Sequence, residues 1–62
     1  MPWSDRKIVS IGGKTFSILL KYCSFEGYRI SCNAEGIVTG YHSSEKEALR
    51  ELEHELREQG SI

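Results

Sequence analysis

The sequence predicts a single α+β domain, in which a four-stranded antiparallel sheet (order ββββα) carries one C-terminal amphipathic helix packed on one face. Three observations lead to this fold class. Residues 1–42 contain four short segments rich in β-branched and aromatic side chains, separated by turn residues. Residues 45–58 instead repeat apolar side chains at helical spacing. The chain has 62 residues, enough for one domain, 1–62, and too few for two.

The first two strands are expected at about 7–11 and 14–22, on either side of Gly12-Gly13. A glycine pair between two β-type segments is typical of a type I′ hairpin, because both central residues of that turn need a positive φ. Residues 1–6 precede the first apolar segment, so we expect them to be loose.

The third and fourth strands are expected at about 28–33 and 37–42. Tyr22 is placed opposite Tyr28, and Tyr28 opposite Tyr41, because these registers bring the apolar side chains of all four strands to one face. A shift of one residue would send them to the other face. The predicted core face carries Val9, Ile11, Phe16, Ile18, Leu20, Tyr22, Tyr28, Ile30, Cys32, Ile37 and Tyr41.

The helix is expected at about 45–58. Ser44 and Glu47 have the spacing of a capping box, in which the serine hydroxyl accepts from the amide three residues later while the glutamate carboxylate reaches back. Gly60 follows as a stop signal. The apolar stripe that should face the sheet consists of Ala48, Leu49, Leu52 and Leu56.

The opposite face of the sheet is the predicted interaction surface. Its outward positions should be Ile8, Ser17, Leu19, Lys21, Arg29, Ser31, Val38, Gly40 and His42. Ile8, Leu19 and Val38 are apolar where solvent favours polar groups, and apolar patches on a surface mark interfaces. A chain this short has little core of its own, so we expect a protein partner or a homodimer at this face or at an edge strand of the sheet. Trp3 and Phe25 are further candidate contacts.

The sequence offers no catalytic or metal-binding constellation. It has two cysteines and two histidines: Cys23, Cys32, His42 and His54. Their spacing does not resemble a zinc site, no base is placed beside a nucleophile, and His42 is expected in solvent at a strand end. Two free thiols are expected, because the predicted register holds the cysteines too far apart for a disulfide. We therefore expect no enzyme activity, no cofactor and no metal.

The distribution of charge differs between the two halves. The net charge is −1, with +2 on residues 1–42 and −3 on residues 43–62. The helix is the acidic element, which suits contact with a basic protein better than contact with a polyphosphate. There is no apolar leader segment and no apolar run of the roughly 20 residues that cross a bilayer. Together with the free thiols this predicts a cytoplasmic protein without a membrane partner.

From about Phe16 to Arg57 the chain resembles the HicB-type antitoxin family and its stand-alone relatives. The matching segments are the strand at 16–20, Glu26-Gly27-Tyr28, Gly36-Ile37-Val38-Thr39-Gly40, and the helix start at 45–49. The resemblance implies a sheet with a packed helix, dimerisation, and a small RNA-cleaving toxin as the protein partner. The family's Pro-Asp-Leu-Pro-Gly segment is replaced here by residues 32–36, and we expect no DNA-binding domain after the helix. The strand at 7–11 is an addition to the family's pattern.

The alternative is a nucleic-acid-binding module. Ser44, Lys46 and Ala48 loosely match the helix start of the double-stranded-RNA-binding domain, which grips phosphates with lysines. Lys21, Arg29 and Lys46 would then contact the nucleic acid. The glutamates on both sides of Lys46 and the missing first helix of that domain count against it. The leading hypothesis is therefore a protein-interaction module, antitoxin-like or inhibitor-like.

Overall fold

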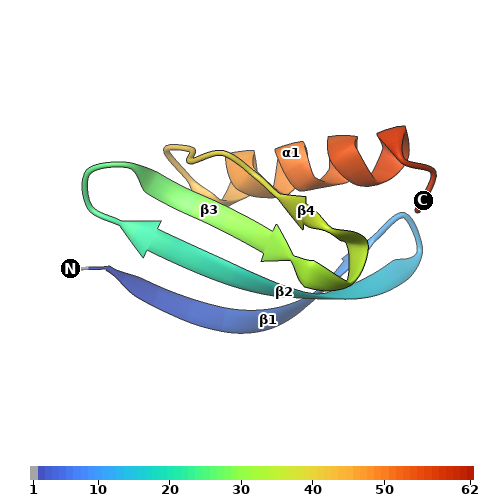
Figure 1. The fold of residues 1–62 in the computed structure, drawn as a ribbon, viewed down its shortest axis with the longest axis horizontal. Helices are drawn as coiled ribbons and strands as arrows, with labels where there is room; N and C mark the ends of the chain where they lie inside the picture. The colour runs from blue at the N-terminus through green and yellow to red at the C-terminus, as the bar shows by residue number, and fades with distance from the viewer. Residues whose placement is uncertain (1) are drawn as a thin grey trace.

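The computed structural model describes residues 2–62 and confirms the predicted ββββα fold (Figure 1). The four strands form one antiparallel sheet in the order β1-β2-β3-β4, and a single helix lies on one face. The elements are β1 (Trp3–Ile11), β2 (Lys14–Cys23), β3 (Gly27–Cys32), the 3₁₀ turn η1 (Asn33–Glu35), β4 (Ile37–Val38) and α1 (Glu45–Glu58).

The first hairpin has the predicted turn but is longer than expected. Gly12 and Gly13 have φ of 60° and 80°, and Ile11 pairs with Lys14. Residues 1–6 were expected to be loose, whereas β1 begins at Trp3, which pairs with Tyr22. The physical reason is that β2 is a central strand of ten residues. Its second half therefore presents a complete row of backbone groups to which residues 3–6 bind.

β4 is shorter than predicted and ends in a bulge. The prediction placed Tyr41 opposite Tyr28, but the partner of Tyr28 is His42. Each of the two residues donates its amide to the carbonyl of the other, with N···O distances of 2.7 and 2.8 Å. Ser31 pairs with Val38, so one extra residue lies between the two pairs. The insertion reverses the faces of the two residues that follow it: His42 reaches the helix, and Tyr41 lies against the outward-facing side chain of Arg29.

The hydroxyl of Thr39 completes the interrupted ladder. Thr39 is buried, with 1% of its surface exposed. Its Oγ1 accepts from the amide of Ile30 at 3.0 Å and donates to the carbonyl of Gly40 at 2.9 Å. The Ile30 amide would otherwise be a buried donor without a partner, since the bulge removes its backbone acceptor. A side chain thus replaces a main-chain group at this position.

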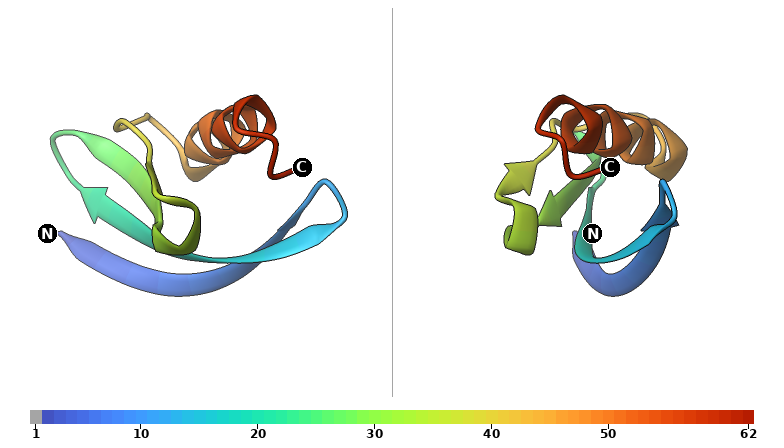
Figure 2. Two further views of the ribbon diagram at one scale, coloured as in Figure 1. Left: turned by 45° about the vertical axis from the view of Figure 1, so that its right-hand side comes forward. Right: turned by 90° about the vertical axis from the view of Figure 1, so that its right-hand side faces the viewer.

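The core lies between the sheet and α1. It consists of Phe16, Ile18, Leu20, Ile30, Cys32, Ile37, Ala48, Leu52 and Leu56, packed against the half-buried Val9, Ile11, Tyr28, Leu49 and Ile62. Both cysteines are free, and Cys32 is fully buried. The sheet curves around the helix, and the C-terminus returns to the β1–β2 turn (Figure 2), where Lys14 Nζ donates to the carbonyl of Ser61 at 2.8 Å.

The ends of α1 follow the predicted signals. The Ser44 hydroxyl accepts from the Glu47 amide at 3.2 Å, which is one half of the predicted capping box. The Glu47 carboxylate was expected to reach back to the start of the helix, but it accepts from Arg50 at 3.4 Å instead. At the other end Gly60 has φ of 80°, and the next amide bonds back to the carbonyl of Leu56 at 2.8 Å. The helix is therefore fixed at both ends by local interactions.

Candidate functional site on the outer face of the sheet

The face of the sheet that α1 leaves uncovered carries the predicted apolar residues. Ile8 is 76% exposed and Val38 is 57% exposed, while Leu19 is half-buried. Leu19 and Val38 stand in one row across the sheet, separated by the small side chain of Ser31. Ile8 lies diagonal to Leu19 on the neighbouring strand, because it pairs with Ser17. The three residues therefore share one face, with gaps between them rather than a continuous patch.

Three basic side chains flank this apolar row. Arg6 pairs directly with Leu19, and Lys21 pairs directly with Arg29 on the neighbouring strand. None of the outward positions of the four strands is acidic. Within residues 2–62, none of the three side chains forms an ion pair. The outer face, defined here by Arg6, Ile8, Leu19, Lys21, Arg29 and Val38, is both partly apolar and positively charged.

Arg29 is the most firmly held of the three cations. Its Nε donates to the carbonyl of Thr39 at 3.1 Å, and its guanidinium lies 4.4 Å from the centroid of the Tyr41 ring. A cation at this distance from an aromatic face is attracted to the ring. The bulge after β4 creates this arrangement, because it turns Tyr41 toward Arg29. The charge of Arg29 is thus presented in a fixed orientation on the outer face.

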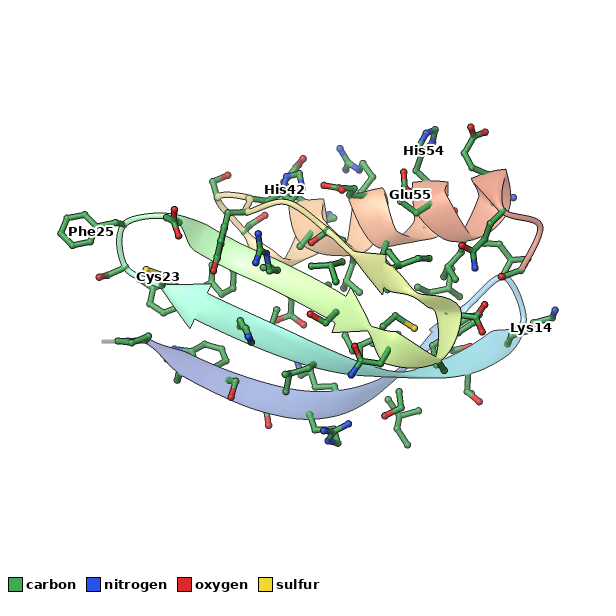
Figure 3. The ribbon with its side chains drawn as sticks, viewed as in Figure 1. Lys14, Cys23, Phe25, His42, His54 and Glu55 are labelled. Atoms are coloured by element: carbon green, nitrogen blue, oxygen red, sulfur yellow. The ribbon has the colours of Figure 1, made fainter. Side chains whose placement is uncertain are left out.

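One end of the sheet gathers most of the aromatic residues, and we call it the aromatic end. Trp3 is stacked on Tyr22 with 5.6 Å between ring centroids, Tyr28 lies 4.9 Å from Tyr22, and Trp3 and Tyr28 meet edge to face at 6.4 Å. Trp3 is still 46% exposed, and Phe25 is 97% exposed. Phe25 projects from the tip of the β2–β3 loop, away from the rest of the chain (Figure 3). Exposed aromatic side chains of this kind anchor protein interfaces.

The hollows on this part of the surface are open ones. One of about 430 Å³ lies between the β2–β3 loop and residues 41–43, and another of about 390 Å³ borders Trp3 and Lys21. Their linings mix aromatic rings with hydroxyl and backbone groups. Small-molecule sites usually enclose most of the ligand, so this surface is better suited to a macromolecule than to a small substrate.

The helix side presents less free charge than its sequence suggests. Four of its six glutamates are already engaged inside the molecule. Glu45 accepts from Lys7 at 2.8 Å, Glu47 from Arg50 at 3.4 Å, and Glu53 from Arg57 at 2.7 Å. The bond to Glu45 is also the main reason that the pKa of Lys7 is raised.

The fourth glutamate, Glu51, holds the segment after β4 against the helix. It accepts from His42 at 2.5 Å and from the amide of Gly40 at 3.3 Å. His42 was expected in solvent on the outer face; it is instead half-buried on the helix side, because the bulge reverses its direction. Among the residues described, Glu55 and Glu58 remain outside any ion pair, and Glu55 and His54 point away from the sheet (Figure 3).

The structure brings together some of the predicted site residues and separates others. Lys21 and Arg29 are direct neighbours, but Lys46 belongs to α1, on the opposite side of the sheet. The cluster of Trp3, Tyr22 and Tyr28 was missed as a unit, although the predicted pairing of the two tyrosines was the signal for it. The contact between Arg29 and Tyr41 had no signal in the sequence, since it depends on the bulge.

Two further properties of the described residues bear on function. No group of three or more His, Cys, Asp and Glu side chains within residues 2–62 is arranged to hold a metal ion. Within residues 2–62 no helix is both long and apolar enough to span a membrane.

Comparisons with known proteins give no further assignment. No protein-family model matches the chain, and no curated protein or solved structure is significantly similar to it.

Proposed function

We propose that this chain is a non-enzymatic protein-interaction module that binds an acidic surface of a partner protein through the outer face of its sheet. One observation carries the proposal. The outer face combines exposed Ile8 and Val38 with three cations that have no carboxylate to pair with. A partner that supplies both apolar contacts and carboxylates would satisfy both features at once.

The energetic case rests on the exposed apolar residues. Full burial of an aliphatic side chain contributes about 1.5–3 kcal/mol, so covering the exposed parts of Ile8 and Val38 would add about 1–2 kcal/mol each. The fixed guanidinium of Arg29 adds specificity rather than most of the affinity, because desolvation of charges offsets much of their attraction. Trp3, on the helix side of the sheet, and Phe25, in the β2–β3 loop, present further exposed aromatic surface at the aromatic end.

The geometry argues against two other modes of binding, one through the helix and one through a dimer of the outer face. The helix was expected to cover a basic partner, but four of its six glutamates already have partners within the chain. A symmetric dimer built face to face on the outer sheet would bring Lys21 and Arg29 of both copies into one interface that contains no carboxylate. Like charges opposite one another cost several kcal/mol at an interface. A different protein with an acidic surface fits better.

The finer form of the proposal is an antitoxin-like or inhibitor-like role in the cytoplasm. The resemblance to HicB-type antitoxins supports it, because that family works by covering a small protein partner. The predicted toxin partner would then have to present acidic and apolar side chains to the sheet, whatever the charge of its RNA-binding surface.

The test uses two charge reversals of equal size on opposite sides of the molecule. Lys21→Glu alters the outer face, and Lys46→Glu alters the exposed start of α1. Each variant and the wild type are used as bait in nuclease-treated lysate of the native host. A protein retained by wild type and Lys46→Glu but lost with Lys21→Glu is the expected result. Equal retention by all three baits, or loss with Lys46→Glu alone, would refute the outer face as the binding surface.

A second candidate is a single-stranded nucleic-acid binder. The favouring observation is that Lys21, Arg29, the half-buried ring of Tyr41 and the exposed ring of Phe25 lie near one end of the sheet. Cations beside stacking rings are the features by which such strands are bound. Because Lys46 is remote, the double-stranded mode of the RNA-binding domain is a poorer match. A salt-sensitive gel shift with oligonucleotides that Lys21→Glu abolishes would support this candidate.

A further inference from the structure

β1 is a long edge strand, and no other strand within residues 2–62 pairs with its outer side. It pairs with β2 over all nine residues, from Trp3 to Ile11, without a bulge. The other edge of the sheet is the two-residue β4, which ends in a bulge. Short or bulged edges resist further pairing, whereas a long regular edge is a template for another strand. Pro2 precedes β1 and none lies within it.

The hairpin geometry shows which groups of β1 face the free side. Ile11 and Lys14 flank the two-residue Gly12-Gly13 turn, and the pair that closes such a turn is hydrogen-bonded. Hydrogen-bonded pairs alternate along an antiparallel ladder, so the odd-numbered residues of β1 bond to β2. The amides and carbonyls of Ser4, Arg6, Ile8 and Ser10 therefore point to the open edge.

We infer that β1 pairs antiparallel with β1 of a second copy of this chain, with Arg6 at the two-fold axis. In this register Asp5 of each copy lies opposite Lys7 of the other, which forms two opposite-charge pairs on the helix side of the sheet, beside the ion pair of each Lys7 with Glu45 of its own chain. Trp3 lies opposite Val9 of the other copy, and an aromatic ring beside a β-branched residue is a favourable cross-strand pair. About six backbone hydrogen bonds join the copies, two from each pair that Ser4, Arg6 and Ile8 form.

The charges of β1 favour the register centred on Arg6 over the register centred on Lys7. Edge charges normally discourage pairing, but Asp5-Arg6-Lys7 is complementary to itself when read antiparallel about Arg6. Centring the dimer on Lys7 instead would place Lys7 opposite Lys7 and leave Asp5 opposite Val9. The chosen register has one like-charge pair, Arg6 with Arg6 on the open outer face, against two opposite-charge pairs.

The dimer would be a continuous eight-stranded sheet with both helices on the same side. The two outer faces would then lie side by side and remain free, so this inference does not rest on the proposed partner binding and can fail independently of it. A partner with a repeated acidic surface would gain from two adjacent sites.

The first test removes the outward amide of Ile8 without relying on its side chain. Ile8→Pro deletes the amide that faces the open edge, where proline is tolerated within a monomer, and Ile8→Ala shortens the side chain but keeps the amide. Sedimentation equilibrium is measured on each variant and on wild type from about 1 to 200 µM. Far-UV circular dichroism of the Pro variant checks that the monomer remains folded.

The second test addresses the register through Asp5, which is exposed. Asp5→Lys places two lysine–lysine pairs across the proposed interface, and Asp5→Asn only removes the attraction. We expect wild type and Ile8→Ala to dimerise, and Ile8→Pro to weaken the dimer at least about tenfold. Asp5→Lys should weaken it about tenfold and Asp5→Asn by a smaller factor.

Three results would overturn the inference. A wild type that stays monomeric up to 200 µM would exclude the dimer at about that affinity. Equal weakening by Ile8→Ala and Ile8→Pro would place the contact at the side chain on the outer face instead of the edge. A dimer that Asp5→Lys leaves unchanged would exclude the register centred on Arg6.

Discussion

The hydroxyl of Thr39 replaces the missing backbone acceptor at the bulge. Its removal therefore tests whether this hydroxyl completes the ladder between β3 and the segment after β4. Thr39→Val keeps the shape and the β-branched character of the side chain but deletes both hydrogen bonds. The amide of Ile30, bonded to the hydroxyl at 3.0 Å, then has no acceptor in a buried site. The carbonyl of Gly40, bonded at 2.9 Å, belongs to an exposed residue and can turn to water.

The cost can be worked out from these two bonds. A buried donor left without a partner costs about 1–3 kcal/mol, and the loss at Gly40 adds little. We therefore expect Thr39→Val to lower the free energy of unfolding by about 2 kcal/mol. A domain of this length has a total of about 3–9 kcal/mol, so the loss is a large fraction. It corresponds to a fall in Tm of about 8–16 °C.

The assay is urea unfolding followed by Trp3 fluorescence and far-UV circular dichroism. Trp3 is stacked in the aromatic cluster, so its emission reports on the fold. Thr39→Ser is the matched control, because it keeps the hydroxyl and loses one methyl group, worth about 1 kcal/mol. If Thr39→Val unfolds within about 0.5 kcal/mol of wild type, the hydroxyl does not complete the ladder.

Two other predictions follow from the contacts of single residues. Gly27 has φ of 99°, and a Cβ there would overlap the carbonyl of His42; Gly27→Ala should therefore lower the free energy of unfolding by more than about 2 kcal/mol in chemical denaturation. Gly36, with φ of 70° and open space for a Cβ, is the matched site, where alanine should cost about 1 kcal/mol; equal losses at both sites would contradict the overlap. Burial raises the pKa of the Cys32 thiol, so alkylation at pH 8, read by mass spectrometry, should modify Cys23 first and reach Cys32 only after unfolding. The unfolded chain releases the Cys32 thiol proton at lower pH than the folded chain, so the free energy of unfolding should fall as the pH rises through the range in which the thiol ionises. If Cys32 reacts as fast as Cys23 in the native protein, the thiol is not buried.

The fold class and most of the register follow from the sequence because they depend on local rules. Gly12-Gly13 specifies a two-residue turn, which fixes the partner of every residue in the first hairpin. The alternation of apolar residues in β2 and β3 then allows one register, with Tyr22 opposite Tyr28. Ser44 and Gly60 mark the limits of the helix by side-chain and backbone chemistry that acts within a few residues.

The extent of β1 and the end of the sheet could not be obtained in this way. Trp3 to Arg6 have little β pattern of their own and become a strand because β2 offers them a long pairing edge. The bulge after β4 depends on Thr39, whose hydroxyl can take the place of a backbone carbonyl only once Ile30 is beside it. Such competition between a side chain and the ladder leaves no periodic signal.

The candidate site also combines features that follow from the sequence with features that depend on the tertiary structure. The sequence by itself determined that Ile8, Leu19 and Val38 occupy one face, because side chains alternate along an extended strand and the apolar pattern sets the register between strands. Only the tertiary structure decided that Arg29 is held against Tyr41 while His42 turns to Glu51, since one inserted residue reverses the faces of the two residues that follow it. It also decided which charges remain free, because the pairing of glutamates across the molecule depends on distances that no local pattern encodes.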